Sequence, residues 1–237
     1  MIKWLRGSGL IKVNLDMMLD AIIFDFDGVI LDSEPIHYEA YCLVLKPLGI
    51  AISYAEYMEK YLGLSDKDAF PKLLHHKGLS YSEAEVQRLM QQKTAIYTNI
   101  ISTSDSLPLI VDFDQFLFKI APKVKKIAIC SGSSRGEITT VLSKVRQGKL
   151  HAYFDTIVTA EDVQVGKPSP EGYLLTAKRL DVAPERCLVI EDTPYGVKAA
   201  KAAGMQVIGL MTTYDRHHFL TADKVITGYR QLLARVW

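Results

Sequence analysis

The sequence predicts an α/β fold with a parallel sheet core, helices on both faces of the sheet, and a helical insert after the first strand. Strand-like and helix-like runs alternate from Ala21 onward, which is typical of such folds. The run from Ile22 to Phe24 is apolar at every position, as expected of a central strand covered on both faces. Residues 33–106 break this alternation, because they contain helical signals and no convincing strand.

Each element of the core follows from an apolar run or a helical pattern. The strands are predicted at Ala21 to Phe24, Lys126 to Cys130, Thr156 to Thr159, Cys187 to Ile190, Gln206 to Leu210 and Lys224 to Ile226. Helices are predicted at Asp112 to Ala121, Arg135 to Val145, Pro170 to Leu180, Gly196 to Ala203 and Tyr229 to Val236. Together they form a Rossmann-like core.

Within the insert, two pairs of residues have the spacing of a capping box that opens a helix. Ser53 is followed by Glu56, and Ser80 is followed by Glu83. The run from Ser80 to about Ile101 has the composition of one long helix. We therefore divide the chain into three parts. Residues 1–19 are a leader of unknown role, residues 20–32 and 107–237 form the core, and residues 33–106 form the helical cap.

Composition excludes several classes of function. The formal net charge of +1, with 49% hydrophobic and 23% charged residues, gives no electrostatic reason to bind nucleic acid or a membrane surface. No apolar stretch approaches the ~18 residues needed to span a bilayer. Cys42, Cys130 and Cys187 cannot form a full disulfide set, so we expect free thiols and a cytoplasmic protein. We also expect a monomer.

Two carboxylates follow the first predicted strand. Asp25 and Asp27 lie at or just beyond its carboxyl end, which is where ligands bind in open α/β sheets. Carboxylates so close repel each other unless a cation or a shared proton relieves the repulsion. Gly28 then allows a sharp turn. The alternative is an ordinary capped turn, since aspartate and glycine are common turn residues.

Three later segments also place polar residues where strands end. Ser131 and Gly132 lie between a strand and a helix, where backbone N–H groups can hold a phosphate. Lys167 lies in a stiff segment with prolines on its carboxyl side and could neutralise a phosphoryl oxygen. Glu191 and Asp192 end another buried strand, and Asp192 with Asp25 would suit Mg²⁺ if the two strands are neighbours.

These four strand ends, in this order, resemble the motifs of the haloacid dehalogenase superfamily of phosphohydrolases and phosphomutases. The first motif matches residues 25–34, with the sequence DFDGVILDSE. Ser131 matches the second motif, Lys167 the third, and Glu191 with Asp192 the fourth. A helical insert after the first motif is similar to the cap of the branch that contains β-phosphoglucomutase and many small phosphatases. The resemblance covers nearly the whole chain from about residue 20.

The resemblance implies a role for each residue. Asp25 would attack phosphorus and form an aspartyl-phosphate, with Asp27 as general acid and then as general base. The Mg²⁺ cofactor would be held by Asp25, the main-chain carbonyl of Asp27, and Asp192, with Glu191 beside it. The groups that would hold the phosphoryl oxygens are Ser131, the Gly132 N–H and Lys167, with Arg135 as a further candidate for binding substrate phosphate.

The expected substrate is a small phosphorylated metabolite. Asp27 favours phosphoryl transfer, because dehalogenases of the superfamily lack an aspartate at that position. The mutase subgroup has a lysine and an arginine in the cap where this chain has Leu62 and Asp66, and a lysine where it has Ser134. We therefore expect a phosphatase, with a phosphomutase as the alternative and a catalytically silent phospho-ligand-binding protein as the remote one. The residues expected to select substrate are Asp66, Lys67 and polar residues near Lys93 and Tyr97.

Overall fold

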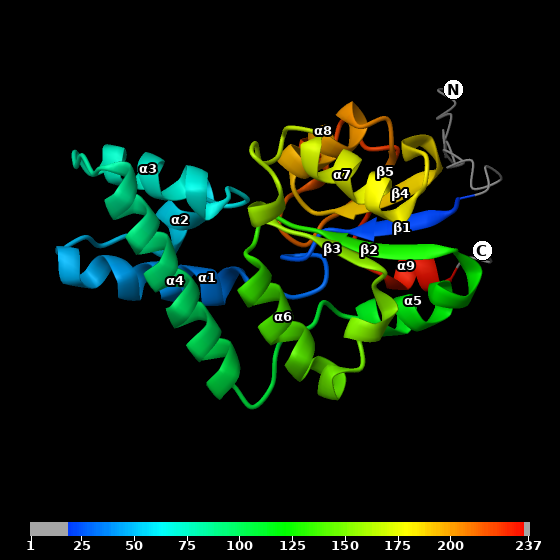
Figure 1. Ribbon diagram of the computed structural model, residues 1–237, viewed down its shortest axis with the longest axis horizontal. Helices are drawn as coiled ribbons and strands as arrows, with labels where there is room; N and C mark the ends of the chain where they lie inside the picture. The colour runs from blue at the N-terminus through cyan, green and yellow to red at the C-terminus, as the bar shows by residue number, and fades with distance from the viewer. Residues whose placement is uncertain (1–18, 235–237) are drawn as a thin grey trace, which may run out of the picture.

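The sheet of the core is parallel and six-stranded. The computed structural model describes residues 19–234 and orders the strands β3-β2-β1-β4-β5-β6 (Figure 1). The strands are β1 (Ala21–Phe24), β2 (Lys126–Cys130), β3 (Thr156–Val158), β4 (Cys187–Glu191), β5 (Gln206–Leu210) and β6 (Lys224–Ile226). Phe24 of β1 lies between Ile129 of β2 and Ile190 of β4, so the carboxyl ends of these strands are level. The predicted fold class is confirmed.

Helices surround the sheet and extend beyond it. They are α1 (Glu34–Leu45), α2 (Tyr54–Lys60), α3 (Asp66–His76), α4 (Glu83–Thr103), α5 (Phe113–Ile120), α6 (Arg135–Lys144), α7 (Glu171–Leu180), α8 (Pro194–Ala202) and α9 (Arg230–Leu233). Short 3₁₀ turns lie at Lys46–Leu48, Ala121–Lys123, Val145–Gly148, His151–Tyr153, Ala160–Asp162, Pro184–Arg186 and Arg216–His218.

Alternation along each strand divides the core into two apolar layers. Ile22 and Phe24 of β1 belong to the layer that includes residues of α5, α6 and α9. Ala21 and Ile23 belong to the opposite layer, with residues of α7 and α8. Successive side chains of a strand point to opposite faces, so both faces must be covered when every residue is apolar. All residues of β1 are buried, as their sequence predicts.

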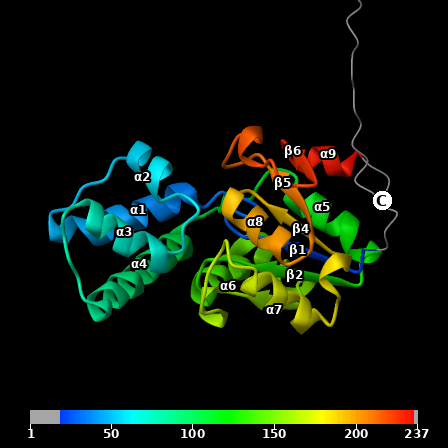
Figure 2. The ribbon, with the colours of Figure 1, turned by 90° about the horizontal axis from the view of Figure 1, so that it is seen from above.

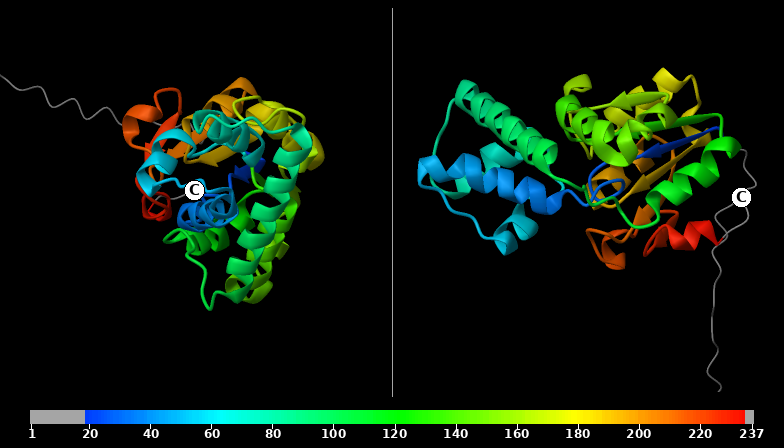
Figure 3. Two further views of the ribbon diagram at one scale, coloured as in Figure 1. Left: turned by 90° about the vertical axis from the view of Figure 1, so that its left-hand side faces the viewer. Right: turned by 90° about the horizontal axis from the view of Figure 1, so that it is seen from below.

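Helices α1 to α4 form the cap, to one side of the sheet (Figures 1 and 2). They have an apolar cluster of their own, which includes Tyr41, Tyr57, Phe70 and Leu73. Helix α5 also follows β1 in the chain, but its Phe113 packs in the cluster of the sheet. Helix α4 runs from the cap to the core, where it lies beside α6 (Figure 3). The domain boundaries at residues 33 and 106 stay a prediction.

Some helix boundaries differ from those predicted. Ser53 caps α2 as expected, because its Oγ accepts a hydrogen bond from the Glu56 N–H at 3.1 Å. The prediction that Ser80 and Glu83 cap α4 is wrong: Ser82 forms the capping box with Glu85. Both pairs have the same spacing, so the pattern alone does not choose between them. The leader, apart from Leu19, and the predicted end of the last helix at Val236 lie outside the described residues.

Neither a membrane span nor a disulfide is seen in the described part of the chain. None of the helices within residues 19–234 is both long enough and apolar enough to cross a bilayer. The cysteines are free, and Cys130 and Cys187 are buried in β2 and β4, as their apolar surroundings predict.

Candidate active site

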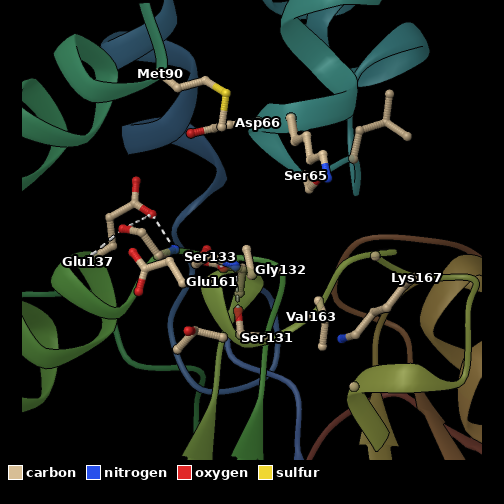
Figure 4. A pocket seen from close by; sticks show the side chains of 18 of the residues that line it. Ser65, Asp66, Met90, Ser131, Gly132, Ser133, Glu137, Glu161, Val163 and Lys167 are labelled. Carbon is tan, nitrogen blue, oxygen red and sulfur yellow. Dashed lines mark hydrogen bonds between the residues drawn. The ribbon is translucent and has the colours of Figure 1, made fainter. Parts of the chain in front are cut away.

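A cavity of about 640 Å³ separates the cap from the carboxyl ends of the central strands. From the core, Asp25, Ser131, Gly132 and Lys167 line it, and from the cap, Asp66 does. Figure 4 shows Asp66, Ser65 and Met90 on the cap side, facing Ser131, Gly132 and Lys167 on the core side. Because β1 lies between β2 and β4, residues that are distant in sequence meet at one edge of the sheet.

Lys167 joins the first and last predicted strand ends. Its Nζ donates to Asp25 Oδ1 at 2.7 Å, to Glu191 Oε1 at 2.6 Å and to the Cys130 carbonyl oxygen at 3.1 Å. Burial acts to lower the pKa of Lys167, but the charges of Asp25 and Glu191 outweigh it and raise that pKa well above its usual value. The lysine is therefore a fixed positive charge beside Asp25.

Asp25, Glu191 and Asp192 form a buried acidic cluster, in which one oxygen from each lies within 4.8 Å of the others. Burial, followed by the charges of Glu191 and Asp25, raises the pKa of Asp192 well above its usual value. Burial is also the main reason why the pKa of Asp25 rises to about 8, and the charge of Lys167 opposes that rise. A cation at this place would relieve the repulsion among the three carboxylates.

The donor set fits Mg²⁺, which prefers oxygen ligands and takes few protein carboxylates. Asp192 Oδ1 is buried without a hydrogen-bond partner, while Thr213 donates to the other oxygen of that carboxylate. Glu191 is already occupied, because its oxygens accept hydrogen bonds from Lys167, Tyr173 and both the N–H and the hydroxyl of Thr193. Asp25 and Asp192 would therefore hold the ion, and Glu191, which is bonded to Lys167, Tyr173 and Thr193, would lie beside them.

Asp27 lies beside this cluster but makes different contacts. Ser33 and Ser133 donate to its two oxygens, and His37 Nε2 lies 3.1 Å from Oδ1. Burial would raise the pKa of Asp27, but the charge of His37 and these hydrogen bonds lower it below its usual value. The carboxylate of Asp27 is therefore bonded to Ser33, Ser133 and His37 and is not one of the three that form the acidic cluster.

The predicted phosphate-binding residues do not all meet. Ser131 and Gly132 line the cavity directly after β2, and Ser131 Oγ accepts the Ser133 N–H at 3.0 Å. Arg135 does not join them: its guanidinium pairs with Asp162 at 2.6 Å and is not among the residues that line the cavity. Helix α6 begins at Arg135, and this first side chain points toward the 3₁₀ turn at Ala160–Asp162.

A second buried charge cluster connects the cap with the core. Lys93 of α4 pairs with Asp66 of α3 at 3.0 Å and with Glu137 of α6 at 2.9 Å. Its Nζ also lies 2.7 Å from Nδ1 of His37, the residue that contacts Asp27. Lys93 is only 1% exposed. The cap lysine is therefore tied to both domains and, through one histidine, to Asp27.

Sequence reasoning missed several partners of the site residues. Two serines, Ser33 and Ser133, donate hydrogen bonds to Asp27, and Thr213 donates one to Asp192. Glu137 pairs with Lys93. The strand-end pattern could have indicated Ser133 and Thr213, because each follows the carboxyl end of a predicted strand within a few residues. Nothing in the sequence pairs Glu137 with a residue of the insert.

Replacing Gly28 by alanine is expected to disturb the acidic cluster. Gly28 has a φ of +70°, and a Cβ there would lie 2.0 Å from Asp192 Oδ2. Gly49→Ala is the matched control, since Gly49 has a φ of +69° with nothing within 4 Å of the added carbon. We expect Gly49→Ala to lower the free energy of unfolding by about 1–2 kcal/mol through backbone strain alone. Gly28→Ala should lower it further and weaken Mg²⁺ binding roughly tenfold or more by displacing Asp192.

Denaturant unfolding and calorimetric titration with Mg²⁺ measure these two effects. Equal losses of stability in the two variants, with unchanged Mg²⁺ affinity in Gly28→Ala, would contradict the assignment of Asp192 to the metal site.

A parallel sheet with an acidic cluster and a fixed lysine at its carboxyl edge, under a helical cap, defines a class of enzymes that act on phosphorylated compounds. Comparison with protein families identifies which one: residues 22–210 match the family described as haloacid dehalogenase-like hydrolase. The chain belongs to this family, and it is a phosphatase-like hydrolase of the branch that also contains β-phosphoglucomutases.

Similar proteins include both phosphatases and mutases. The chain is 32% identical to a phosphorylated carbohydrates phosphatase of Thermotoga maritima, over 80% of this chain and 84% of that one. It is 31% identical to the fructose-1-phosphate phosphatase YqaB of Escherichia coli, over 79% of this chain and 94% of that one. Its fold matches the crystal structure of a β-phosphoglucomutase from Clostridium difficile with a TM-score of 0.80 and 29% identity, covering 91% and 93% of the two chains.

Proposed function

We propose that the protein is a Mg²⁺-dependent phosphatase that hydrolyses a small sugar phosphate, or a similar monoester, through an aspartyl-phosphate on Asp25. The observation that carries this proposal is that Asp25 lies on the cavity wall, bonded to the Lys167 ammonium and in the same acidic cluster as Asp192, which has an unpartnered oxygen. A carboxylate is a weak nucleophile toward a phosphate dianion unless positive charge offsets their repulsion. Lys167 supplies one such charge.

The residues support a two-step reaction. In the first step an Asp25 oxygen bonds to phosphorus, the bond from phosphorus to the ester oxygen breaks, and Asp27, which must enter this step protonated, gives its proton to that oxygen and becomes a carboxylate. In the second step Asp27 removes a proton from water, whose oxygen attacks phosphorus and releases phosphate and free Asp25. The hydrogen bonds from Ser33 and Ser133 favour the carboxylate form of Asp27 that the second step needs. Bound Mg²⁺ would offset the charge on the phosphoryl oxygens.

The cap favours hydrolysis over the mutase alternative. A phosphomutase of this kind passes through a bisphosphate intermediate, so the phosphate that is not being transferred needs a cation in the cap. Leu62 is 6% exposed and apolar, and Asp66 carries a negative charge that would repel a second phosphate. The relatives that hydrolyse carbohydrate phosphates support a sugar phosphate as the substrate. The β-phosphoglucomutase of similar fold keeps the mutase as the second candidate.

A panel of phosphorylated metabolites tests both candidates in one experiment. We expect phosphate release that requires Mg²⁺ and stops when EDTA removes it, with sugar phosphates among the substrates. β-Glucose 1-phosphate is included, and formation of glucose 6-phosphate is followed in parallel. Conversion to glucose 6-phosphate without phosphate release would establish a mutase instead. The absence of both products across the panel would leave only the silent binding protein.

A further inference from the structure

We propose that the cap side of the cavity selects an uncharged, hydroxyl-rich leaving group and rejects any substrate with a second anionic group, and that Asp66 is the residue that determines this specificity. The inference rests on the proposed function, since it concerns the leaving group of the same phosphate ester. It would exclude sugar bisphosphates and phosphorylated sugar acids as substrates.

The wall of the cavity carries more negative than positive groups. Among the described residues that line the cavity, six carboxylates stand against three lysines. The carboxylates are those of Asp25, Asp27, Glu34, Asp66, Glu137 and Glu161, and the lysines are Lys67, Lys93 and Lys167. Lys167 lies beside Asp25, at the place where the transferred phosphate is expected. His37 lines the cavity too and adds at most one positive charge. In the rest of the cavity five carboxylates thus still outnumber three positive groups, which disfavours a second anion.

The buried cation of the cap, Lys93, is already neutralised by carboxylates. Lys93 contacts Asp66 at 3.0 Å and Glu137 at 2.9 Å. Burial would lower the pKa of Lys93, yet the charges of these two carboxylates raise it above its usual value. A second phosphate could bind Lys93 only by displacing a carboxylate, which would then be buried without a partner.

The start of α3 presents a carboxylate where a helix could otherwise bind an anion. The N-terminus of a helix attracts anions through its free N–H groups and its dipole. In α3 the first turn carries Asp66, which lines the cavity, next to the N-cap Ser65; Asp68 of the same turn does not line the cavity and accepts a hydrogen bond from Ser65. Asp66 is fixed there, because Tyr41 donates a hydrogen bond to its Oδ1 at 2.7 Å while Lys93 pairs with its Oδ2. The place where a helix could have bound a second phosphate thus presents a carboxylate.

Neutral polar groups complete this side of the cavity. Gln87, Gln91 and Thr94 of α4 line it near Lys93, and Ser65 lines it from the start of α3. Amide and hydroxyl side chains can both donate and accept, which suits the hydroxyl groups of a sugar or polyol. The carboxylate of Asp66 can accept a hydrogen bond from a hydroxyl group but not from an ionised phosphate.

Lys67 is the residue that could oppose this arrangement. It is exposed, and its Nζ donates to the Gln164 carbonyl oxygen at 3.0 Å. A carbonyl does not neutralise the lysine, but water screens the charge of an exposed side chain. We therefore expect Asp66, whose side chain is only 19% exposed, to have the larger effect.

Matched substrate pairs test the proposal, because the members of each pair differ mainly by one anionic group. Fructose 1-phosphate is compared with fructose 1,6-bisphosphate, and glucose 6-phosphate with 6-phosphogluconate, by the kcat/KM of phosphate release. The wild-type protein should favour the member of each pair that lacks the second anionic group, by roughly a hundredfold in kcat/KM. This is the effect of one like charge a few ångströms away at intermediate dielectric constant. Asp66→Asn should reduce that ratio about tenfold or more.

Two further variants make the experiment specific. Asp68→Asn is the matched control: Asp68 lies on the same first turn and bonds to Ser65, but it is not among the cavity residues. It should leave the ratio unchanged. Lys67→Gln should also leave the ratio unchanged or increase it. Because the ratio is measured within one protein sample, a partly unfolded variant does not distort it.

The outcomes separate this proposal from the proposed function. Equal kcat/KM values within each pair, or a ratio that Asp66→Asn does not alter, would overturn the role of Asp66. A preference for the bisphosphate that Lys67→Gln abolishes would assign anion binding to Lys67 instead. p-Nitrophenyl phosphate serves as a substrate with no second anion. If the wild-type protein hydrolyses it and Asp25→Asn does not, the proposed phosphatase function stands whatever the result for Asp66.

Discussion

Asp25→Asn is expected to reduce phosphate release by about 10⁴-fold or more, the effect typical of removing a covalent nucleophile. Asparagine has nearly the same shape as aspartate, and its carbonyl oxygen can still accept the hydrogen bond that Lys167 donates to Asp25 Oδ1. What is lost is the negative charge and the oxygen that attacks phosphorus. The steady-state rate of phosphate release with the best substrate of the panel measures the effect.

An exposed aspartate provides the control for this substitution. Asp105 lies outside the cavity, so Asp105→Asn should retain wild-type activity. Thermal unfolding of Asp25→Asn should show that the protein remains folded, because the substitution keeps the shape of the side chain and relieves repulsion in the acidic cluster. Activity above about 1% of wild type in a folded Asp25→Asn sample, far more than loss of a nucleophile allows, would mean that another group attacks phosphorus.

The core was predictable because its pattern is local. β1 and β2 have the predicted bounds, since each is an apolar run that ends abruptly at Asp25 or Ser131. The carboxyl ends of parallel strands lie at the same edge of the sheet. Residues that directly follow such strands therefore reach that edge whatever the connecting helices contain. That is why Asp25 and Asp192 could be expected to meet if their strands were neighbours, as they are. Lys167 lies well beyond the end of β3, and only its match to a family motif indicated its place.

The interface between cap and core was not predictable for the opposite reason. Lys93, Asp66 and Glu137 are separated by long stretches of chain and meet only because α4 packs beside α6. No periodicity or spacing encodes such a contact, and each residue by itself resembles an ordinary charged residue on the surface of a helix. The start of α4 shows a smaller ambiguity, because two serine and glutamate pairs with identical spacing overlap there.

Lys93→Met is expected to lower the free energy of unfolding by about 3–5 kcal/mol, because it removes one partner of a buried ion pair. Lys93 and Glu137 each have a side chain only 2% exposed, so the glutamate would be left charged and without its partner. Asp66 would lose its partner as well, although it is more exposed. Lys72→Met is the control: Lys72 is an exposed lysine of the cap, and its loss should change stability by less than about 0.5 kcal/mol. Chemical denaturation measures both variants.

The double variant Lys93→Met with Glu137→Met identifies the cause of that loss. If the unpaired carboxylate destabilises the single variant, removing it should recover a large part of the stability, since buried ion pairs are often replaced by apolar residues at little cost. If instead the aliphatic stem of Lys93 matters through its packing near Tyr41 and Tyr97, methionine should already preserve most of it and the single variant would be nearly as stable as wild type. A double variant less stable than Lys93→Met would contradict the charge argument, and Glu137 would then act through its hydrogen bonds to the start of α6.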